Sequence, residues 1–330
     1  MLKQSVSRSL THQFRTTFQP SPITRLPIQR TFRLPKKDNG VLTLNPGKKA
    51  FTLLFDGDKL PVQAGVLQAV NVSSVEEANR FLFLLRDTCE IYISPDYRRS
   101  NPEVYAEVKA FSYSGVKTDP PFGIETAADL MRKLPFDLKS LMKSPLAITA
   151  DDSSPCSLDK KFVHKKSDSN VLISEFYSAG KLLYFNMFND TEELTFDHAS
   201  DHIQGMLMLE ALRQAAVAIT HILGLSLDGK LALLSYNTNF FHYLERDTPI
   251  VIRAYGSFSA DKTGDDREVS VFVQVMQWGK VCAEAELKAF AFMSEHHYLQ
   301  QKERIEKISS RCKMQFAAKV SRILEAEPSL

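Results

Sequence analysis

The most distinctive hydrophobic pattern lies over residues 203–223, where Met, Leu, Ala, Val and Ile occupy most positions. Glu210, Arg213 and Gln214 stand inside this apolar stretch. A helix that is apolar nearly all round is normally buried, and Gly224 is a suitable C-terminal cap. We therefore predict a long buried helix whose charged residues need partners or a function.

Stretches rich in β-branched and aromatic residues flank this helix and predict strands, two before it and four after it. The predicted strands are residues 171–177, 182–188, 231–241, 250–258, 269–278 and 281–293. Gly180, Gly264 and Gly279 lie in turn signals between neighbouring strands. This order predicts an α+β domain over residues 161–294 with the hotdog fold, an antiparallel sheet wrapped round a long central helix.

A smaller α+β unit is predicted for residues 40–118. Its strands are expected at residues 49–56, 66–72, 89–94 and 104–113, and a helix is expected after the serine cap at Ser73-Ser74. Residues 106–113 are similar in sequence to residues 285–292. This unit is therefore either a degenerate first repeat of a double hotdog or an unrelated domain. Prolines predict a linker over residues 119–160.

The two ends of the chain differ in character. Residues 1–39 are basic, with apolar residues at every fourth position from Leu2 to Phe18 and several prolines. They are typical of a disordered tail or of a mitochondrial-type targeting segment, so we expect a cytoplasmic protein or, alternatively, an organellar one. Residues 295–330 predict an amphipathic helix that packs on the outside of the domain or on a partner. No apolar run is long enough to span a membrane.

Composition narrows the class of partner. The formal net charge is +2 and the hydrophobic fraction is 44%, so a globular protein is expected and nucleic acid is not its default partner. The four cysteines are far apart and form no CxxC pair. They are typical of reduced thiols in an intracellular protein, and we predict neither a disulfide framework nor a metal site.

Four segments then occur in order at workable spacing. They are Val163-His164-Lys165-Lys166, Val171-Leu172-Ile173-Ser174, Asp201-His202-Ile203-Gln204-Gly205-Met206 and Glu210-Ala211-Leu212-Arg213-Gln214. Together they resemble the A-factor biosynthesis family, whose members are γ-butyrolactone synthases with hotdog repeats. The resemblance implies an acyltransferase that moves a β-ketoacyl group from a thioester of acyl carrier protein or coenzyme A to a small hydroxyl acceptor such as dihydroxyacetone phosphate. It implies no further cofactor.

Other activities remain open. The segment of residues 205–211 is also similar to the helix of β-hydroxyacyl thioester dehydratases, so a dehydratase or thioesterase is an alternative. A non-catalytic module that binds an acyl chain or a lactone is another. In each case the apolar tunnel is expected between the helix and a neighbouring repeat or subunit, in a homodimer or an internal double hotdog.

Glu210, His202 and Arg213 are the predicted catalytic residues. Glu210 is the candidate general base, because burial is expected to raise its pKa; the alternative is a structural ion pair with Arg213, three residues along the helix. Arg213 could hold a phosphate or an enolate oxygen, and Gln214 could orient its neighbours. His202 is the candidate catalytic imidazole.

The remaining candidates, Gln214 among them, are assigned to substrate binding. The helix start at Gly205-Met206 could supply N–H groups to an oxyanion. His198 and Asp201 could contact substrate or cap the loop, and nothing supplies His198 and His202 with a convincing set of metal ligands. His164 and Lys165 belong to a basic cluster that could receive a phosphate or an acyl carrier protein. The simplest expectation for His221 and Trp278 is a place in the core.

Overall fold

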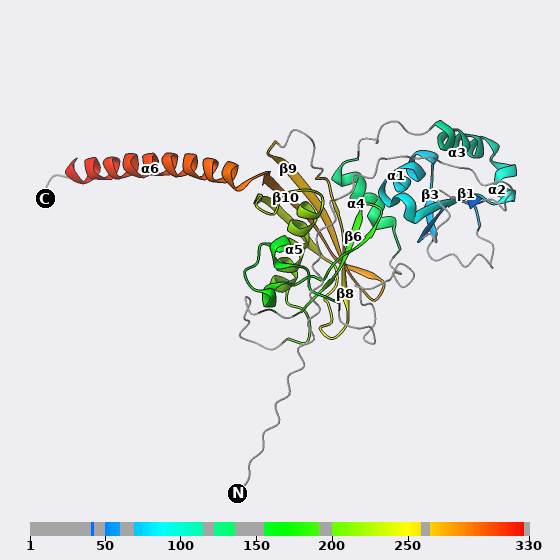
Figure 1. The fold of residues 1–330 in the computed structure, drawn as a ribbon, viewed down its shortest axis with the longest axis horizontal. Helices are drawn as coiled ribbons and strands as arrows, with labels where there is room; N and C mark the ends of the chain where they lie inside the picture. Colours follow the sequence, from blue (N-terminus) through cyan, green and yellow to red (C-terminus); the bar gives the residue numbers. More distant parts are fainter. Residues whose placement is uncertain are drawn as a thin grey trace, which may run out of the picture.

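The computed structural model describes residues 41–42, 50–59, 69–114, 122–135, 155–189, 191, 200–258 and 265–326. Within these ranges the chain forms a six-stranded sheet, a four-stranded sheet and six α-helices (Figure 1). The predicted tail of residues 1–39, His198 and most of the predicted linker lie outside the described residues.

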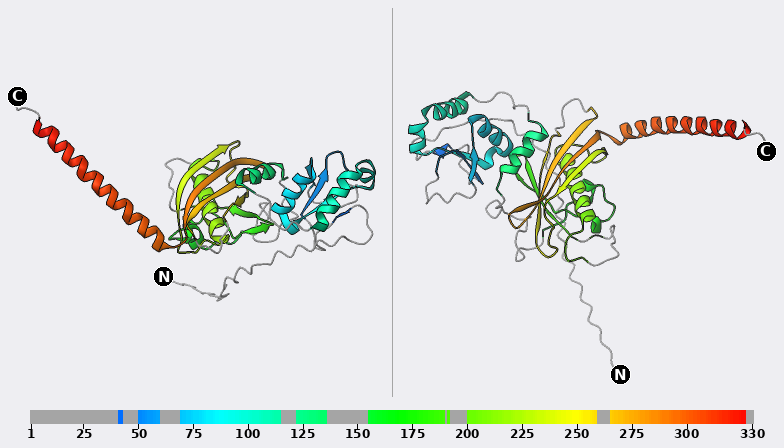
Figure 2. Two further views of the ribbon diagram at one scale, coloured as in Figure 1. Left: turned by 90° about the horizontal axis from the view of Figure 1, so that it is seen from above. Right: turned by 180° about the vertical axis from the view of Figure 1, so that it is seen from behind.

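The six-stranded sheet is antiparallel throughout, in the order β5-β6-β8-β9-β10-β7. Its strands are β5 (Tyr177–Ala179), β6 (Leu182–Met187), β7 (Lys230–Phe240), β8 (Ile250–Gly256), β9 (Arg267–Gln277) and β10 (Lys280–Phe292). Helix α5 (Gly205–Ile222) lies against one face of the sheet (Figure 2). The predicted helix and sheet are therefore confirmed. The strand expected at residues 171–177 is reduced to isolated bridges at Ile173 and Ser174 before β5 begins.

Both faces of this sheet are buried, and β8 shows it most clearly. Ile252 and Ala254 face α5, whereas Val251 and Tyr255 pack on the opposite side with residues of the N-terminal unit. Alternate residues of a strand point to opposite faces, so a strand covered on both sides is apolar at nearly every position.

The N-terminal unit is built on a mixed sheet in the order β1-β4-β2-β3, in which β2 pairs parallel with β3 and β4. Its elements are β1 (Val41–Leu42), β2 (Phe51–Phe55), β3 (Ala69–Val72), α1 (Val75–Leu85), β4 (Cys89–Tyr92), α2 (Pro95–Ser100), α3 (Pro102–Ser114) and α4 (Ile124–Lys133). The serine cap is confirmed, because the Ser74 side chain accepts a hydrogen bond from the Glu77 N–H.

The strand predicted at residues 104–113 is wrong, since these residues belong to helix α3. Val104 and Val108 satisfy both a strand pattern and the four-residue repeat of a helix, and Pro102 at the helix start is a signal that decides for the helix. Residues 285–292, which resemble this segment, lie in β10. The similarity therefore has no structural counterpart, and the parallel pairs of β2 differ from the antiparallel hotdog sheet.

Helix α4 falls inside the predicted linker, and it packs on the outer face of the six-stranded sheet. Arg253 of β8 is fully buried there and donates hydrogen bonds to the carbonyl oxygens of Met131 (2.9 Å) and Pro135 (3.3 Å) and to Gln274 Oε1 (2.7 Å). The end of a helix carries partial negative charge on its free carbonyls. A cation of the sheet therefore caps the C-terminus of α4 and joins the two units.

The hairpin of β9 and β10 is closed by a two-residue turn, Trp278-Gly279, in which both φ angles are positive (50° and 73°). That backbone matches a type I′ turn, whose twist suits paired strands. The expectation that Trp278 lies in the core is wrong: the side chain is 64% exposed. The hydrophobic side chain favoured a place in the core, but β9 ends at Gln277, so Trp278 lies in the turn at the tip of the hairpin.

Helix α6 (Glu295–Ala326) leaves the domain after β10 and extends away from it (Figures 1 and 2). All side chains from residue 301 to residue 323 are exposed. The amphipathic helix is confirmed, but in the described chain it packs on nothing beyond its first turns. None of the described helices has both the length and the apolarity required to cross a membrane.

The junction at Arg253 yields a stability prediction. Arg253→Met should leave the Met131 and Pro135 carbonyls buried without donors, and we expect a loss of about 3 kcal/mol in the free energy of unfolding, measured with urea. Arg80→Met on α1, which breaks only an exposed ion pair with Glu76, should change stability by less than about 0.5 kcal/mol. Equal losses for the two variants would contradict the proposed role of Arg253.

Candidate functional site

The polar residues of helix α5 form one stripe. Glu210, Gln214 and His221 are four and seven residues apart, a spacing that keeps side chains on the same face of a helix. This face is turned away from the sheet and towards a short segment of residues 160–172, whose η2 turn (Lys160–Val163) packs against α5. Val163 is buried there, and so anchors the segment that follows it.

His164 closes the η2 turn in a left-handed conformation, with φ of 57°. Only a few per cent of residues other than glycine adopt this backbone. It directs two consecutive side chains, His164 and Lys165, to α5, where they meet His221 and Glu210. The basic element predicted to bind substrate is therefore part of the helix's own polar environment.

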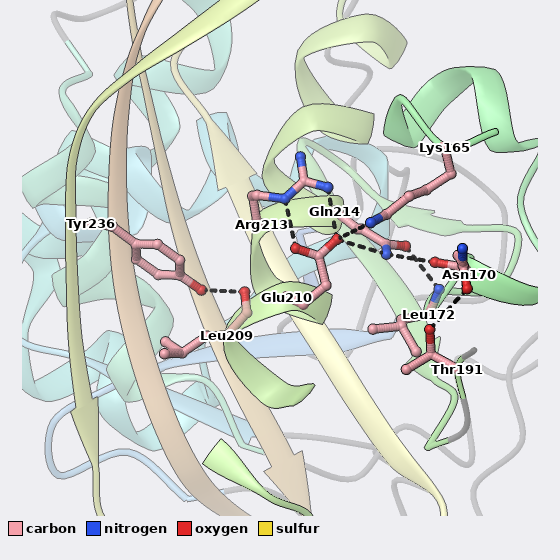
Figure 3. Close-up of polar contacts among 9 residues, drawn as sticks. All are labelled: Lys165, Asn170, Leu172, Thr191, Leu209, Glu210, Arg213, Gln214 and Tyr236. Carbon is pink, nitrogen blue, oxygen red and sulfur yellow. Dashed lines mark hydrogen bonds and ion pairs between the residues drawn. The ribbon is translucent and has the colours of Figure 1, made fainter. Parts of the chain in front are cut away.

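Glu210 is the centre of a charged cluster (Figure 3). Its carboxylate accepts two hydrogen bonds from Arg213, from Nε at 2.8 Å and from Nη2 at 2.7 Å. Lys165 Nζ lies 2.9 Å from Oε1, and Gln214 Nε2 donates to the same oxygen at 3.0 Å. The side chains of Glu210 and Lys165 are only 18% and 8% exposed. The cluster is thus a mostly buried ion pair with two cations.

The expected rise in the pKa of Glu210 is wrong. Burial alone raises the pKa, as predicted, but the hydrogen bonds from Arg213 and Lys165 and the charge of Arg213 outweigh burial and lower the pKa to about 2. The Glu210 carboxylate is therefore ionised at neutral pH, and the ion-pair alternative is present. The burial could be inferred from the sequence, whereas the contact with Lys165 joins segments 45 positions apart.

Gln214 is fully buried and does more than orient its neighbours on the helix. Its Oε1 accepts a hydrogen bond from the Leu172 N–H at 2.8 Å, and its Nε2 donates to the Asn170 carbonyl at 2.8 Å (Figure 3). One amide side chain thus pairs with the backbone of the segment that carries Lys165. On the other side of α5, the Tyr236 hydroxyl donates to the Leu209 carbonyl at 2.6 Å.

His164 and His221 form a second polar pair, with their Nε2 atoms 2.8 Å apart. His221 Nδ1 lies 3.1 Å from the Leu225 carbonyl, which can only accept. The hydrogen therefore sits on Nδ1 of His221, and Nε2 of His164 donates to Nε2 of His221. Burial and nearby positive charge lower the pKa of His164 to about 4, and burial also lowers the pKa of His221. Both rings are neutral at pH 7.

His221 is buried as expected for a core residue, but its contact with His164 was missed. A signal was available: His221 lies seven residues after Gln214, on the same polar stripe of α5. The partner could not be inferred, because the pairing depends on the tertiary contact between η2 and the helix.

An apolar cleft opens between α5 and strands β7, β9 and β10. Its lining residues are Arg213, Ala216, Val217, Thr220, Leu231, Leu233, Val269, Val271, Leu287 and Ala289. Arg213 is the charged residue among them, so one end of the cleft meets the cluster around Glu210. The tunnel was expected against a neighbouring repeat or subunit, whereas this cleft lies between the helix and its own sheet.

Asp201 and His202 lie apart from the charged cluster. His202 Nδ1 is 2.9 Å from Asp201 Oδ1 and 3.1 Å from Ser200 Oγ, and both residues are exposed. In the part of the chain that is described, neither residue hydrogen-bonds to Glu210 or Arg213. The structure therefore does not bring His202 together with the other two predicted catalytic residues.

The start of α5 is open. Gly205 is the first helical residue, and a Cβ added to it would meet no atom within 4 Å. Met206 is exposed. Packing against the described residues therefore does not require glycine at this position. Over the described ranges, no three His, Cys, Asp or Glu side chains gather in a way that could hold a metal ion.

Fold and site define an α+β domain of the hotdog class. Residues 146–293 match the family model of the A-factor biosynthesis hotdog domain. Among curated proteins, none matches the sequence.

Two solved structures are similar at a low level. A thioesterase from Haemophilus influenzae is 14% identical, with 36% of this chain and 76% of that chain covered and a TM-score of 0.28. A thioesterase variant from Pseudomonas aeruginosa is 15% identical, with 36% and 81% covered and a TM-score of 0.29. Similarity this low says nothing about substrate.

The low pKa of Glu210 yields a test of stability against pH. A carboxyl group whose folded pKa (about 2) is below its ordinary value of 4.5 stabilises the fold above pH 4.5 and loses that contribution as the pH falls towards 2. Wild type should therefore lose about 2 kcal/mol relative to Glu210→Gln between pH 6 and pH 3, measured by urea unfolding.

Two further variants serve as controls for this test: the single variant Lys165→Met and the double variant Lys165→Met with Glu210→Gln. A double-mutant cycle at pH 6 should give a coupling of at least about 1 kcal/mol between the two residues. A parallel pH dependence of wild type and Glu210→Gln would show that Glu210 is not held by its cations.

Proposed function

We propose that the hotdog domain binds an acyl thioester and transfers the acyl group to a small hydroxyl acceptor. The observation that carries this proposal is the apolar cleft that ends at Arg213. Ligand sites are mostly apolar clefts with a few placed polar groups. An acyl chain fits the apolar part of this cleft, and the reacting carbonyl then lies near the charged end.

Arg213 and Lys165 are the groups that we assign to anion binding. A guanidinium has five N–H donors and can bind a carboxylate and a second anion together. The ionised Glu210 fixes Arg213 through two hydrogen bonds and also holds Lys165 (Figure 3). Glu210 is thus a positioning residue in this proposal, and the cations bind the phosphate of the acceptor or the oxyanion of the transition state.

Glu210 is a poor general base, because a group with a pKa of about 2 rarely takes up a proton at neutral pH. Of the two groups we assign that role to His164, whose ring is neutral at pH 7 and whose pKa of about 4, although also lowered, is closer to neutrality than that of Glu210. Its Nε2–H donates to His221, so its Nδ1 is the nitrogen that accepts a proton. The acceptor oxygen then bonds to the thioester carbon while the C–S bond breaks, and the proton passes from the hydroxyl through His164 to the departing thiolate.

A second candidate is a non-catalytic module that binds the acyl chain or a lactone. The ion pair of Glu210 with Arg213 and Lys165 favours this candidate, since a carboxylate that is already paired with two cations is suited to a structural role. The exposed side chains of Lys161 and Lys166 beside the site are suited to an acidic carrier protein in either case.

We also propose a homodimer through β7, an edge strand of the six-stranded sheet. Such an edge presents unpaired backbone groups to another strand. On or next to β7, five large hydrophobic side chains are exposed: Leu233, Leu234, Phe240, Phe241 and Tyr243. Pairing of two copies of β7 would cover them and join two sheets edge to edge.

Transfer is tested by mass spectrometry after incubation with β-ketoacyl thioesters, with and without dihydroxyacetone phosphate. We expect an acyl ester that requires the acceptor, and His164→Gln should lower kcat about a hundredfold while thioester affinity stays unchanged. Ala289→Phe should fill the cleft and lower kcat/KM for long acyl chains about tenfold more than for short ones.

Ala232→Phe is the matched control, because its neighbours Leu231 and Leu233 line the cleft and alternation turns Ala232 to the other face. Thioester that binds but stays intact with every acceptor would replace the transferase by the binding module. Release of free acid would indicate a thioesterase, and loss of water a dehydratase.

The dimer is tested by sedimentation velocity. Leu234→Lys combined with Phe240→Lys should shift wild-type dimer to monomer, because like charges would face each other across paired edges. Leu227→Lys, also at an exposed leucine but off the strand, should leave the dimer intact. A monomeric wild type, or a dimer insensitive to the β7 changes, would reject this interface.

A further inference from the structure

Helix α6 carries an apolar face, interrupted by Ser309 and Lys319, that the rest of the described chain leaves uncovered. Ile305, Ile308, Cys312, Phe316, Val320 and Ile323 are spaced by three or four residues, and all are exposed. At 100° per residue they fall within an arc of about 120°. Exposed hydrophobic residues scattered singly need no explanation, but an aligned set marks an interaction surface.

The charged residues of the same helix are unevenly distributed along its length. From residue 307 to residue 324 there is no acidic residue, and five basic ones occur: Lys307, Arg311, Lys313, Lys319 and Arg322. Lys307 pairs with Glu303 one turn earlier, at 2.7 Å. Within the described residues, the later basic residues form no ion pair. This half of α6 is therefore a basic amphipathic helix, the type that binds anionic surfaces.

The spacing of the apolar residues argues against a coiled coil with a second copy of the chain. A heptad that begins at Ile305 and Ile308 continues to Cys312 but then places Gln315, Lys319 and Arg322 in the seam. The observed period is instead close to 3.6, which keeps the stripe straight on an unsupercoiled helix. A straight apolar stripe over five turns fits a flat surface.

We propose that residues 305–323 of α6 bind the surface of a membrane that contains anionic lipids, with the helix lying in the interfacial plane. The apolar face enters the boundary between headgroups and acyl chains, and the basic residues contact lipid phosphates and carboxylates. Lys319 lies on the apolar face, and its long stem can extend to the headgroups. This role does not depend on the proposed acyl transfer.

The test is flotation of the full-length protein with vesicles of phosphatidylcholine alone or of phosphatidylcholine mixed with phosphatidylserine. Binding to the mixed vesicles should be at least about tenfold tighter, because each basic residue near an anionic surface contributes roughly fivefold. It should weaken as salt is added. Equal binding to both vesicles, or none to either, would overturn the proposal.

Two matched variants separate the apolar face from general charge. Phe316 and Met314 are similarly exposed (70% and 67%) but lie on opposite sides of the helix. Phe316→Glu should lower vesicle affinity at least about tenfold, whereas Met314→Glu, with the same change in charge, should lower it by roughly fivefold or less. Circular dichroism confirms that α6 remains helical in both. Equal losses would reject a specific apolar face.

A fluorescence measurement reports insertion directly. Cys89 and Cys282 are buried, so in a Cys156→Ser background an environment-sensitive dye attaches at Cys312 on the apolar face. Its emission should shift to the blue with anionic vesicles, and a dye moved to position 310 on the opposite face should not respond. Self-association of the protein that Phe316→Glu abolishes, without any vesicle-induced shift, would assign the face to a protein partner and overturn the proposal.

Discussion

The enclosure of helix α5 is the constraint on which the rest of the structure depends. An apolar helix is stable in water only when burial removes most of its surface, and the six-stranded sheet covers one side of α5. The polar stripe of Glu210, Gln214 and His221 must then lie on the other side, against the segment of residues 160–172. This segment supplies the side chains of Lys165 and His164 and two backbone groups that pair with Gln214. The site exists because a buried helix with polar residues requires this second layer.

The same constraint explains why the sheet has so little free surface. Its inner face packs on α5, and its outer face packs on α4 and the N-terminal unit, to which Arg253 is joined by hydrogen bonds. Among the surfaces that stay open in the described chain are the β7 edge, the cleft beside Arg213 and the long helix α6. The three proposals made above concern these three surfaces, and the cleft and the β7 edge share Leu233.

Much of the fold could be predicted, because strands and the central helix are encoded by local patterns. The central helix was expected to begin at residue 203, and α5 begins at Gly205. The strand predicted at residues 104–113 was wrong because the spacing of Val104 and Val108 fits both the two-residue period of a strand and the repeat of a helix. The prediction of a raised pKa for Glu210 was wrong for another reason. Its burial can be inferred from the neighbouring residues, but Lys165, which pairs with it, comes from a turn distant in the sequence. The local sequence therefore identified the residue but gave the wrong direction for the shift of its pKa.

The single tryptophan has a practical consequence. Trp278 is the only such residue in the chain, and it sits exposed at the tip of the β9–β10 hairpin rather than beside the cleft or in either core. Its indole is already in water in the native state. Intrinsic tryptophan emission is therefore a poor optical reporter of ligand entry or of global unfolding in this protein. The tyrosines packed inside the sheet, among them Tyr184 and Tyr255, are better placed for that purpose.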